Sequence, residues 1–239
     1  MQQTTTTMFI FRPGPLLCLF LMLNWSAAIA QSGQKPRPSV NYKYLLYVPK
    51  AYHRNQSAYP LVIYLHGGSH RGNDLNKLKQ YGPPHVIEQG RKFKCIIASP
   101  QCPVGKNWST ENWFDSLYAE LSRTYRIDPK RVYLTGVSIG GYGTWQTAIA
   151  HPNTFAAIAP LCGGCDDSTQ VCQIRNVPVW TLHGTADDLI PIDETARLVR
   201  RLNECKGNVR FTRLTGKGHD ILYLYEEKAI YTWLLKQHK

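Results

Sequence analysis

The stretch Arg131–Gly143 reads RVYLTGVSIGGYG and decides the fold. It begins with a short apolar, β-branched run, Val132–Thr135, of the kind that forms buried strands. Gly-x-Ser-x-Gly follows at once over residues 136–140, and the chain continues into a helix candidate, Gly141–Ala150. A strand that turns into a helix through Gly-x-Ser-x-Gly is typical of a nucleophile elbow. The stretch therefore predicts an α/β fold with a serine held at the edge of its sheet.

This turn predicts Ser138 as a nucleophile. So tight a turn forces strained backbone angles on the serine, and the residues two before and two after it must be small. Gly136 and Gly140 meet that requirement. Gly-x-Ser-x-Gly also arises by chance in roughly one chain in ten of this length. A serine hydroxyl needs an imidazole and a carboxylate to become reactive. The prediction that Ser138 is a nucleophile therefore depends on finding a matching histidine and acid in the sequence.

The acid and the base follow the serine in the order that such a fold imposes. The strand candidate Val179–Leu182 leads into a turn with Asp187 and Asp188, and the residues alone leave the choice between them open. Either carboxylate can also merely cap the turn. His219 lies in Gly-Lys-Gly-His-Asp, after the strand candidate Val209–Leu214. We predict His219 as the general base.

Backbone amides are the candidates for an oxyanion hole. Residues 65–69 read LHGGS at the end of an earlier strand candidate, and glycines there let N–H groups approach a developing negative oxygen. We predict the amides of Gly68 and Ile139 in this role; a glycine turn without function is the alternative. His66 and His183, which precede glycines at strand ends, are expected to be buried structural histidines.

The rest of the chain alternates between strand and helix candidates. The remaining strands are expected at Tyr42–Val48, Leu61–Leu65, Cys95–Ser99 and Ala156–Leu161, and the remaining helices at Asn112–Tyr125, Asp193–Cys205 and Glu226–Gln237. Asp193 is placed to serve as an N-cap. In the first of these helices an apolar residue recurs at every fourth position, which predicts one face against a sheet. Such alternation favours a doubly wound, mostly parallel sheet without a lid domain.

The N-terminus has the pattern of a signal peptide. Arg12 is the only charged residue among the first thirty, Leu16–Leu23 is apolar, and Ala28-Ile29-Ala30 has the form of a cleavage site. We therefore expect residues 1–30 to be removed and residues 31–239 to form one catalytic domain. The apolar run is far shorter than the roughly 20 residues that span a bilayer, so no stable membrane insertion is expected.

Composition is that of an ordinary globular protein. The 239 residues are 43% hydrophobic and 18% charged, which excludes a disordered chain, a fibre and a multi-pass membrane protein. The net charge of +12 suits nucleic acid or an anionic polymer, but the charges are scattered and no nucleic-acid-binding module is present. We expect no nucleic-acid partner; oligomeric state is left open.

Six of the seven cysteines lie beyond the leader. An even number in an exported chain predicts disulfide bonds, and the sequence cannot choose among the fifteen pairings of six cysteines. We take Cys95–Cys102 and Cys172–Cys205 as working pairs. A zinc or redox site at Cys162-Gly-Gly-Cys165 is an alternative, but a second Cys-x-x-Cys and a suitable histidine pair are missing.

Taken together, the motifs resemble a known family. They comprise YPLVIYLHGG (59–68), RGND (71–74), SPQCP (99–103), the elbow with its GYGTW (141–145), His183-Gly184-x-x-Asp187 and GHD (218–220). They resemble compact α/β-hydrolase esterases of the phospholipase/carboxylesterase type, relatives of feruloyl esterases, polyhydroxybutyrate depolymerases and dienelactone hydrolases. The resemblance covers nearly all of the chain beyond residue 30. It selects Asp187 as the acid and implies that Trp108 is a wall of the substrate cleft. One departure is His70, where the family pattern has an acidic residue.

The sequence and the resemblance together predict a secreted or periplasmic serine hydrolase. Ser138, His219 and Asp187 would cleave a carboxylic ester, small or polymer-borne, through an acyl-enzyme intermediate. Neither a cofactor nor a metal ion is expected, because the chain has no ligand-spacing motif. Two alternatives remain: a peptidase of the prolyl-oligopeptidase type, and a binding protein that keeps the fold without catalysis. The nature of the ester is not specified by the sequence.

Overall fold

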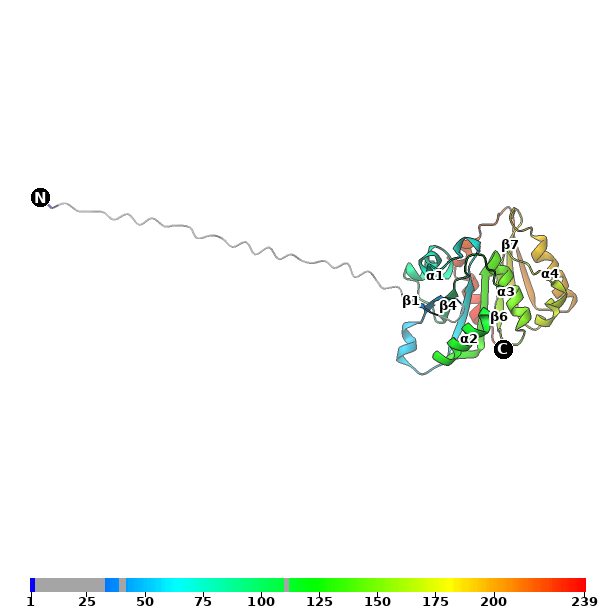
Figure 1. Cartoon of the computed structure of the whole chain (residues 1–239), viewed down its shortest axis with the longest axis horizontal. Helices are drawn as coiled ribbons and strands as arrows, with labels where there is room; N and C mark the ends of the chain where they lie inside the picture. The colour runs from blue at the N-terminus through cyan, green and yellow to red at the C-terminus, as the bar shows by residue number, and fades with distance from the viewer. Residues whose placement is uncertain (3–32, 39–41, 110–111) are drawn as a thin grey trace.

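A single mixed sheet forms the centre of the protein in a computed structural model, which describes residues 1–2, 33–38, 42–109 and 112–239 (Figure 1). Within these residues the sheet has eight strands in the order β1-β2-β4-β3-β5-β6-β7-β8. The strands are β1 (Gln34–Arg37), β2 (Tyr44–Tyr47), β3 (Tyr59–Leu65), β4 (Ile96–Pro100), β5 (Ile127–Val137), β6 (Ala157–Leu161), β7 (Val179–Gly184) and β8 (Val209–Leu214). The predicted signal peptide falls almost wholly on residues 3–32, outside the described part of the chain.

The sheet is mostly parallel, as predicted. Strands β1 and β2 and strands β2 and β4 pair antiparallel, whereas every pair from β4 across to β8 is parallel. Strand β3 lies between β4 and β5, and all seven of its residues are buried. Leu61, Ile63 and Leu65 pack into one apolar cluster and Val62 and Tyr64 into the other. A strand covered on both faces needs a continuous apolar sequence, and this is why β3 could be predicted.

Helices cover both faces of this sheet. On one face lie α2 (Trp113–Thr124), α3 (Ile139–Ala150) and α4 (Asp193–Glu204), and on the other α1 (Gly82–Glu88) and α5 (Ala229–Lys236). The predicted stripe of α2 is confirmed, since Trp113, Leu117 and Leu121 are all buried against the sheet. None of the helices in the described residues is long and apolar enough to cross a membrane.

Three local features differ from the sequence prediction. Strand β1 lies within residues 31–39, a stretch of sequence without an apolar run. It joins β2 through backbone hydrogen bonds, which leave no pattern in the side chains. Helix α1 has only seven residues. It begins at Gly82, which two prolines follow, and such a sequence is more typical of a turn than of a helix. The N-cap of α4 is Ile192 rather than Asp193. Asp193 instead lies in the first turn, where its carboxylate faces the positive end of the helix dipole.

The cysteines correct one predicted disulfide bond and confirm the other. Cys172 and Cys205 are bonded. Cys95 and Cys102 are buried thiols that form no disulfide bond, so that pairing was wrong. They flank β4, whose five extended residues alone span about 16 Å, whereas bonded cysteines need Cα atoms about 4.4–6.8 Å apart.

The Cys-x-x-Cys alternative is also excluded by the fold. Cys162 packs into the apolar cluster beside α5, and Cys165 packs into the cluster beneath α2, α3 and α4. The two thiols therefore lie on opposite faces of the sheet. They cannot share a zinc ion or form a redox-active bond with each other.

Candidate active site

Ser138 lies at the sharp turn between β5 and α3. Its φ of 59° and ψ of −122° are strained for a residue with a side chain. The turn also brings backbones into contact: a Cβ on Gly136 would lie 2.4 Å from the Gly140 carbonyl oxygen, and one on Gly140 would lie 2.1 Å from that of Leu65. Both distances are impossible for a methyl group. The two glycines are therefore required for the geometry that the sequence predicted.

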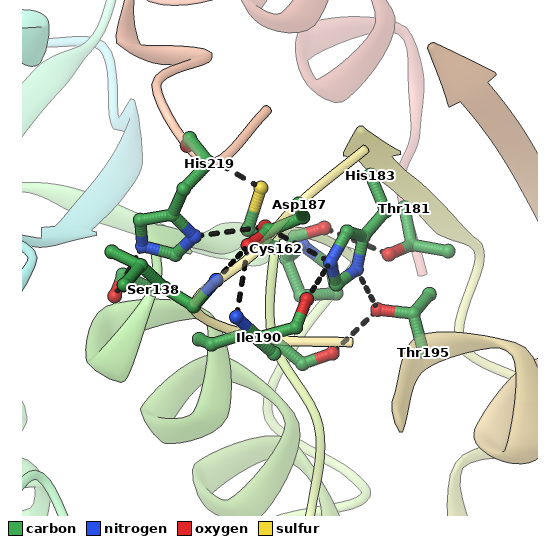
Figure 2. Close-up of polar contacts among 11 residues, drawn as sticks. Ser138, Cys162, Thr181, His183, Asp187, Ile190, Thr195 and His219 are labelled. Carbon is green, nitrogen blue, oxygen red and sulfur yellow. Dashed lines mark hydrogen bonds and ion pairs between the residues drawn. The ribbon is translucent and has the colours of Figure 1, made fainter. Parts of the chain in front are cut away.

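Ser138, His219 and Asp187 form a continuous hydrogen-bonded line (Figure 2). His219, in the loop after β8, places Nε2 2.9 Å from the Ser138 hydroxyl oxygen. Its Nδ1 lies 2.8 Å from Oδ2 of Asp187, in the loop after β7. An ionised carboxylate only accepts hydrogen bonds, so Nδ1 carries the proton. Nε2 is then free to accept the proton of the serine hydroxyl.

The surroundings of Asp187 keep it ionised. Its side chain is completely buried, and burial alone raises the pKa of a carboxyl group. The backbone amides of Ile190 and Leu189 donate to Oδ1 at 2.8 and 3.0 Å, and His219 donates to Oδ2. These donors outweigh the cost of burial, so the pKa of Asp187 is lowered. Asp188 is exposed, and the structure brings Asp187 rather than Asp188 to His219.

The two predicted oxyanion amides belong to segments near Ser138. Ile139 is the first residue of α3, so its amide has no acceptor within the helix. Gly68 lines the same pocket as Ser138. The neighbouring Gly67 approaches the serine so closely that a Cβ there would lie 3.5 Å from that of Ser138. The structure thus brings both predicted segments next to the serine.

His66 fixes the loop that carries these glycines. Its Nδ1 lies 2.7 Å from the Gly67 carbonyl oxygen and must donate, while Nε2 accepts from the Cys102 amide at 2.9 Å. The ring therefore holds one proton, on Nδ1. Burial lowers the pKa of His66 to about 4, so it is neutral at pH 7. These two hydrogen bonds give His66 the structural role that the sequence predicts.

The serine lies in a pocket of about 330 Å³, within the usual size range of small-molecule sites. Three apolar side chains, Val137, Leu189 and Leu222, contribute to its lining, and His70 is buried in its wall. Sequence reasoning identified His70 only as a departure from the family pattern and missed that it lines the pocket of Ser138. No sequence signal distinguishes it.

Trp108 does not line this pocket. It is buried, its indole N–H donates to the His66 carbonyl oxygen at 3.2 Å, and its Cβ occupies the space next to Gly143. It borders a different pocket of about 370 Å³ that also includes residues of α2 and α3. The structure therefore does not bring Trp108 to the serine, because the ring is needed in the core under the Gly67 loop.

One cluster has the donor atoms of a metal site, but the protonation and hydrogen bonding of these atoms do not suit a bound ion. Cys162, Asp187 and His219 place possible ligand atoms within 4.8 Å of one another. Burial raises the pKa of the Cys162 thiol, which keeps it protonated and makes it a poor ligand. The Nδ1 atom of His219 and Oδ2 of Asp187 are already bonded to each other. The cluster therefore fits a hydrogen-bond network better than a bound ion.

The chain is similar to a known family and to several curated esterases. The family model described as phospholipase/carboxylesterase matches residues 107–234, which include Ser138, Asp187 and His219. The chain is 37% identical over 137 residues to a bifunctional acetylxylan esterase/xylanase of Neocallimastix patriciarum, covering 55% of this chain and 20% of that protein. It is 26% identical over 200 residues to a probable feruloyl esterase C of Aspergillus terreus, covering 76% and 72%.

Solved structures share the fold. A thermostable esterase superposes with a TM-score of 0.71 and 31% identity, over 87% of this chain and 64% of that one. A ferulic acid esterase superposes with a TM-score of 0.65 at 16% identity, over 85% and 96%. The α/β-hydrolase fold is therefore confirmed. Several curated relatives are much longer proteins, since the chain covers only 20–28% of the length of the first three.

Proposed function

Because the chain belongs to the phospholipase/carboxylesterase family, as its motifs predict, we propose that it hydrolyses carboxylic esters with Ser138 as the nucleophile. The observation that carries this proposal is the line from Asp187 through His219 to Ser138, with distances of 2.8 and 2.9 Å. It ends in a pocket that Gly68 also lines, and Ile139 follows the serine directly in sequence. These are the parts that acyl transfer through a serine requires.

The first half of the reaction forms an acyl-enzyme. The Ser138 oxygen attacks the ester carbonyl carbon while its proton passes to Nε2 of His219. Negative charge gathers on the carbonyl oxygen, where the amides of Gly68 and Ile139 stabilise it. His219 is then an imidazolium next to the buried Asp187 carboxylate. It returns the proton to the alkoxide of the leaving alcohol as the carbon–oxygen bond breaks.

The second half repeats these steps with water. His219 takes a proton from a water molecule, whose oxygen attacks the acyl carbon. The second tetrahedral intermediate collapses, the bond to Ser138 breaks, and His219 gives the proton back to the serine oxygen. The products are the free carboxylic acid and the restored enzyme, so the cycle balances without a cofactor.

The acyl group is proposed to occupy the pocket beside Val137, Leu189 and Leu222. Names of similar proteins point to several ester classes, namely acetylxylan esterase, poly(3-hydroxyalkanoate) depolymerase and feruloyl esterase. A panel of acetyl, hydroxybutyryl and feruloyl esters therefore resolves the acyl preference. A peptide chromogen tested in parallel separates an esterase from a peptidase.

We further propose that the protein is exported and that residues 31–239 act as one catalytic domain after removal of residues 1–30. The Cys172–Cys205 disulfide bond supports an oxidising compartment. The mature N-terminus of the exported protein is expected at Gln31. A secreted protein that still carries residues 1–30 would contradict this.

The direct test of the proposed function is a pair of serine variants. Ser138→Ala is expected to lose p-nitrophenyl acetate hydrolysis by at least about 1,000-fold while its melting curve stays close to that of the parent. Ser57→Ala is the matched control. Ser57 is exposed and is distant in sequence from Ser138, so this variant should keep full activity. Turnover retained in Ser138→Ala would refute the proposal.

A further inference from the structure

A second buried histidine contacts Asp187 from the side away from His219 (Figure 2). His183 is at the end of β7, four residues before Asp187, and its side chain is fully buried. Its Nε2 lies 3.1 Å from Oδ2 of Asp187 and 2.9 Å from the Ile190 carbonyl oxygen. The sequence predicts a structural histidine here but gives no sign of this contact.

The proton positions on His183 follow from its neighbours. The Ile190 carbonyl and the ionised Asp187 can only accept hydrogen bonds, so Nε2 must carry a proton. On the other side of the ring, Nδ1 lies 2.8 Å from the Thr195 hydroxyl oxygen. Burial lowers the pKa of His183, which favours the neutral ring with its single proton on Nε2. Nδ1 faces the Thr195 hydroxyl, whose single proton lies between the ring and the Gly163 carbonyl oxygen.

Thr195 is itself held in place. Its hydroxyl oxygen lies 2.5 Å from the Gly163 carbonyl oxygen, and its side chain is completely buried at the start of α4. The hydroxyl is thus fixed between a backbone carbonyl and the His183 ring. This arrangement fixes the plane of the ring and therefore the direction of its Nε2–H bond.

We propose that His183 is a positioning residue for the reaction, which donates from Nε2 to Oδ2 of Asp187 and holds that carboxylate at the angle His219 needs. The inference rests on the proposed function of Ser138, His219 and Asp187. The Nε2–H group of His183 is shared between the Ile190 carbonyl oxygen and Oδ2 of Asp187, so Oδ2 lies against two imidazoles while Oδ1 accepts from two amides. These contacts restrict the rotation of a carboxylate whose side chain is completely buried.

The effect on catalysis is confined to the rate of the chemical steps. His183 is fully buried and does not line the pocket of Ser138, so it does not touch the substrate. Without its hydrogen bond, Asp187 keeps its two amide donors but can rotate at Oδ2, and His219 is less often aligned with the serine. Removing a hydrogen bond to a charged group corresponds to a loss of about 10- to 100-fold.

Two variants of similar size separate the donor from the bulk of the ring. His183→Leu fills the space without a donor, whereas His183→Gln keeps an N–H within reach of Asp187. We expect kcat for p-nitrophenyl acetate to fall about 10- to 100-fold in His183→Leu with KM unchanged, and to stay within about 3-fold of the parent in His183→Gln. Equal kcat in the two variants would overturn the proposal, since a merely structural ring would not distinguish them.

A double-mutant cycle tests whether His183 acts through Asp187. In an Asp187→Asn background the charge that His183 serves is gone, so His183→Leu should cost less than about 3-fold further. The same loss in both backgrounds would overturn the proposal. If neither His183 variant folds, Thr195→Val carries the test: kcat should fall about 3- to 10-fold at unchanged KM, and an unchanged kcat would overturn it.

The two proposals fail in different ways. If Ser138→Ala keeps the parent rate, the proposed function is wrong whatever His183 does. If Ser138→Ala is inactive while His183→Leu is as active as the parent and as well folded by its melting curve, only the role of His183 is refuted.

Discussion

Acidification is expected to destabilise the protein through His66. This side chain is 1% exposed, and burial lowers its pKa from 6.5 to about 4. The unfolded chain therefore takes up the proton first as the pH falls. His66 contributes stability that is fully present above pH 6.5 and is lost as the pH falls through 4. At about 1.4 kcal/mol per pH unit, the free energy of unfolding should drop by about 3 kcal/mol between pH 7.5 and pH 4 on account of His66 alone.

The assay compares three proteins, because other groups also titrate in this range. Urea unfolding curves at pH 7.5, 5.5 and 4 are recorded for the parent, for His66→Gln and for His53→Gln. A glutamine side chain cannot take up a proton, so His66→Gln should lose about 3 kcal/mol less than the parent over this range. His53 is exposed, and its variant should follow the parent. Parallel pH dependence in the parent and His66→Gln would refute the reasoning.

Three further predictions concern the elbow, the acid and the disulfide bond. Gly140→Ala should leave no active folded enzyme in an expression and activity assay, since its Cβ would lie 2.1 Å from a carbonyl oxygen of β3. Asp187→Asn should lower kcat by about 10,000-fold and Asp188→Asn by less than about 3-fold, and steady-state kinetics with similar losses in both would contradict the assignment. Replacing Cys172 and Cys205 by serine should lower the free energy of unfolding by about 3–4 kcal/mol for their separation of 33 residues, whereas an unchanged urea midpoint would contradict it.

Much of the fold could be predicted because its strands are buried on both faces. Continuous apolar runs such as Leu61–Leu65 report directly on that burial. The turn at Ser138 could be predicted for a different reason: a Cβ at either flanking glycine would lie only 2.1–2.4 Å from a carbonyl oxygen, so the turn requires glycine at both positions. Strand β1 could not be predicted, because it pairs through its backbone and three of its four residues are exposed.

The errors have physical causes as well. The predicted strand Cys95–Ser99 already argued against a Cys95–Cys102 bond, because an extended strand carries the chain away from Cys95. The strand prediction was therefore the more reliable of the two. Trp108, which the resemblance implies as a wall of the substrate cleft, is buried and borders a pocket other than that of Ser138, a placement that residue type alone does not specify. The contact of His183 with Asp187 depends on the path of a four-residue turn, which residue types alone do not specify.

The central claim is that Ser138 is a nucleophile activated by His219. The most direct measurement is the mass of the intact protein and of its peptides after reaction with a fluorophosphonate probe. One adduct per chain is predicted, on the peptide that contains Ser138, and it should be absent in Ser138→Ala and form far more slowly in His219→Ala. An unlabelled parent protein, or an adduct on another residue, would contradict the account.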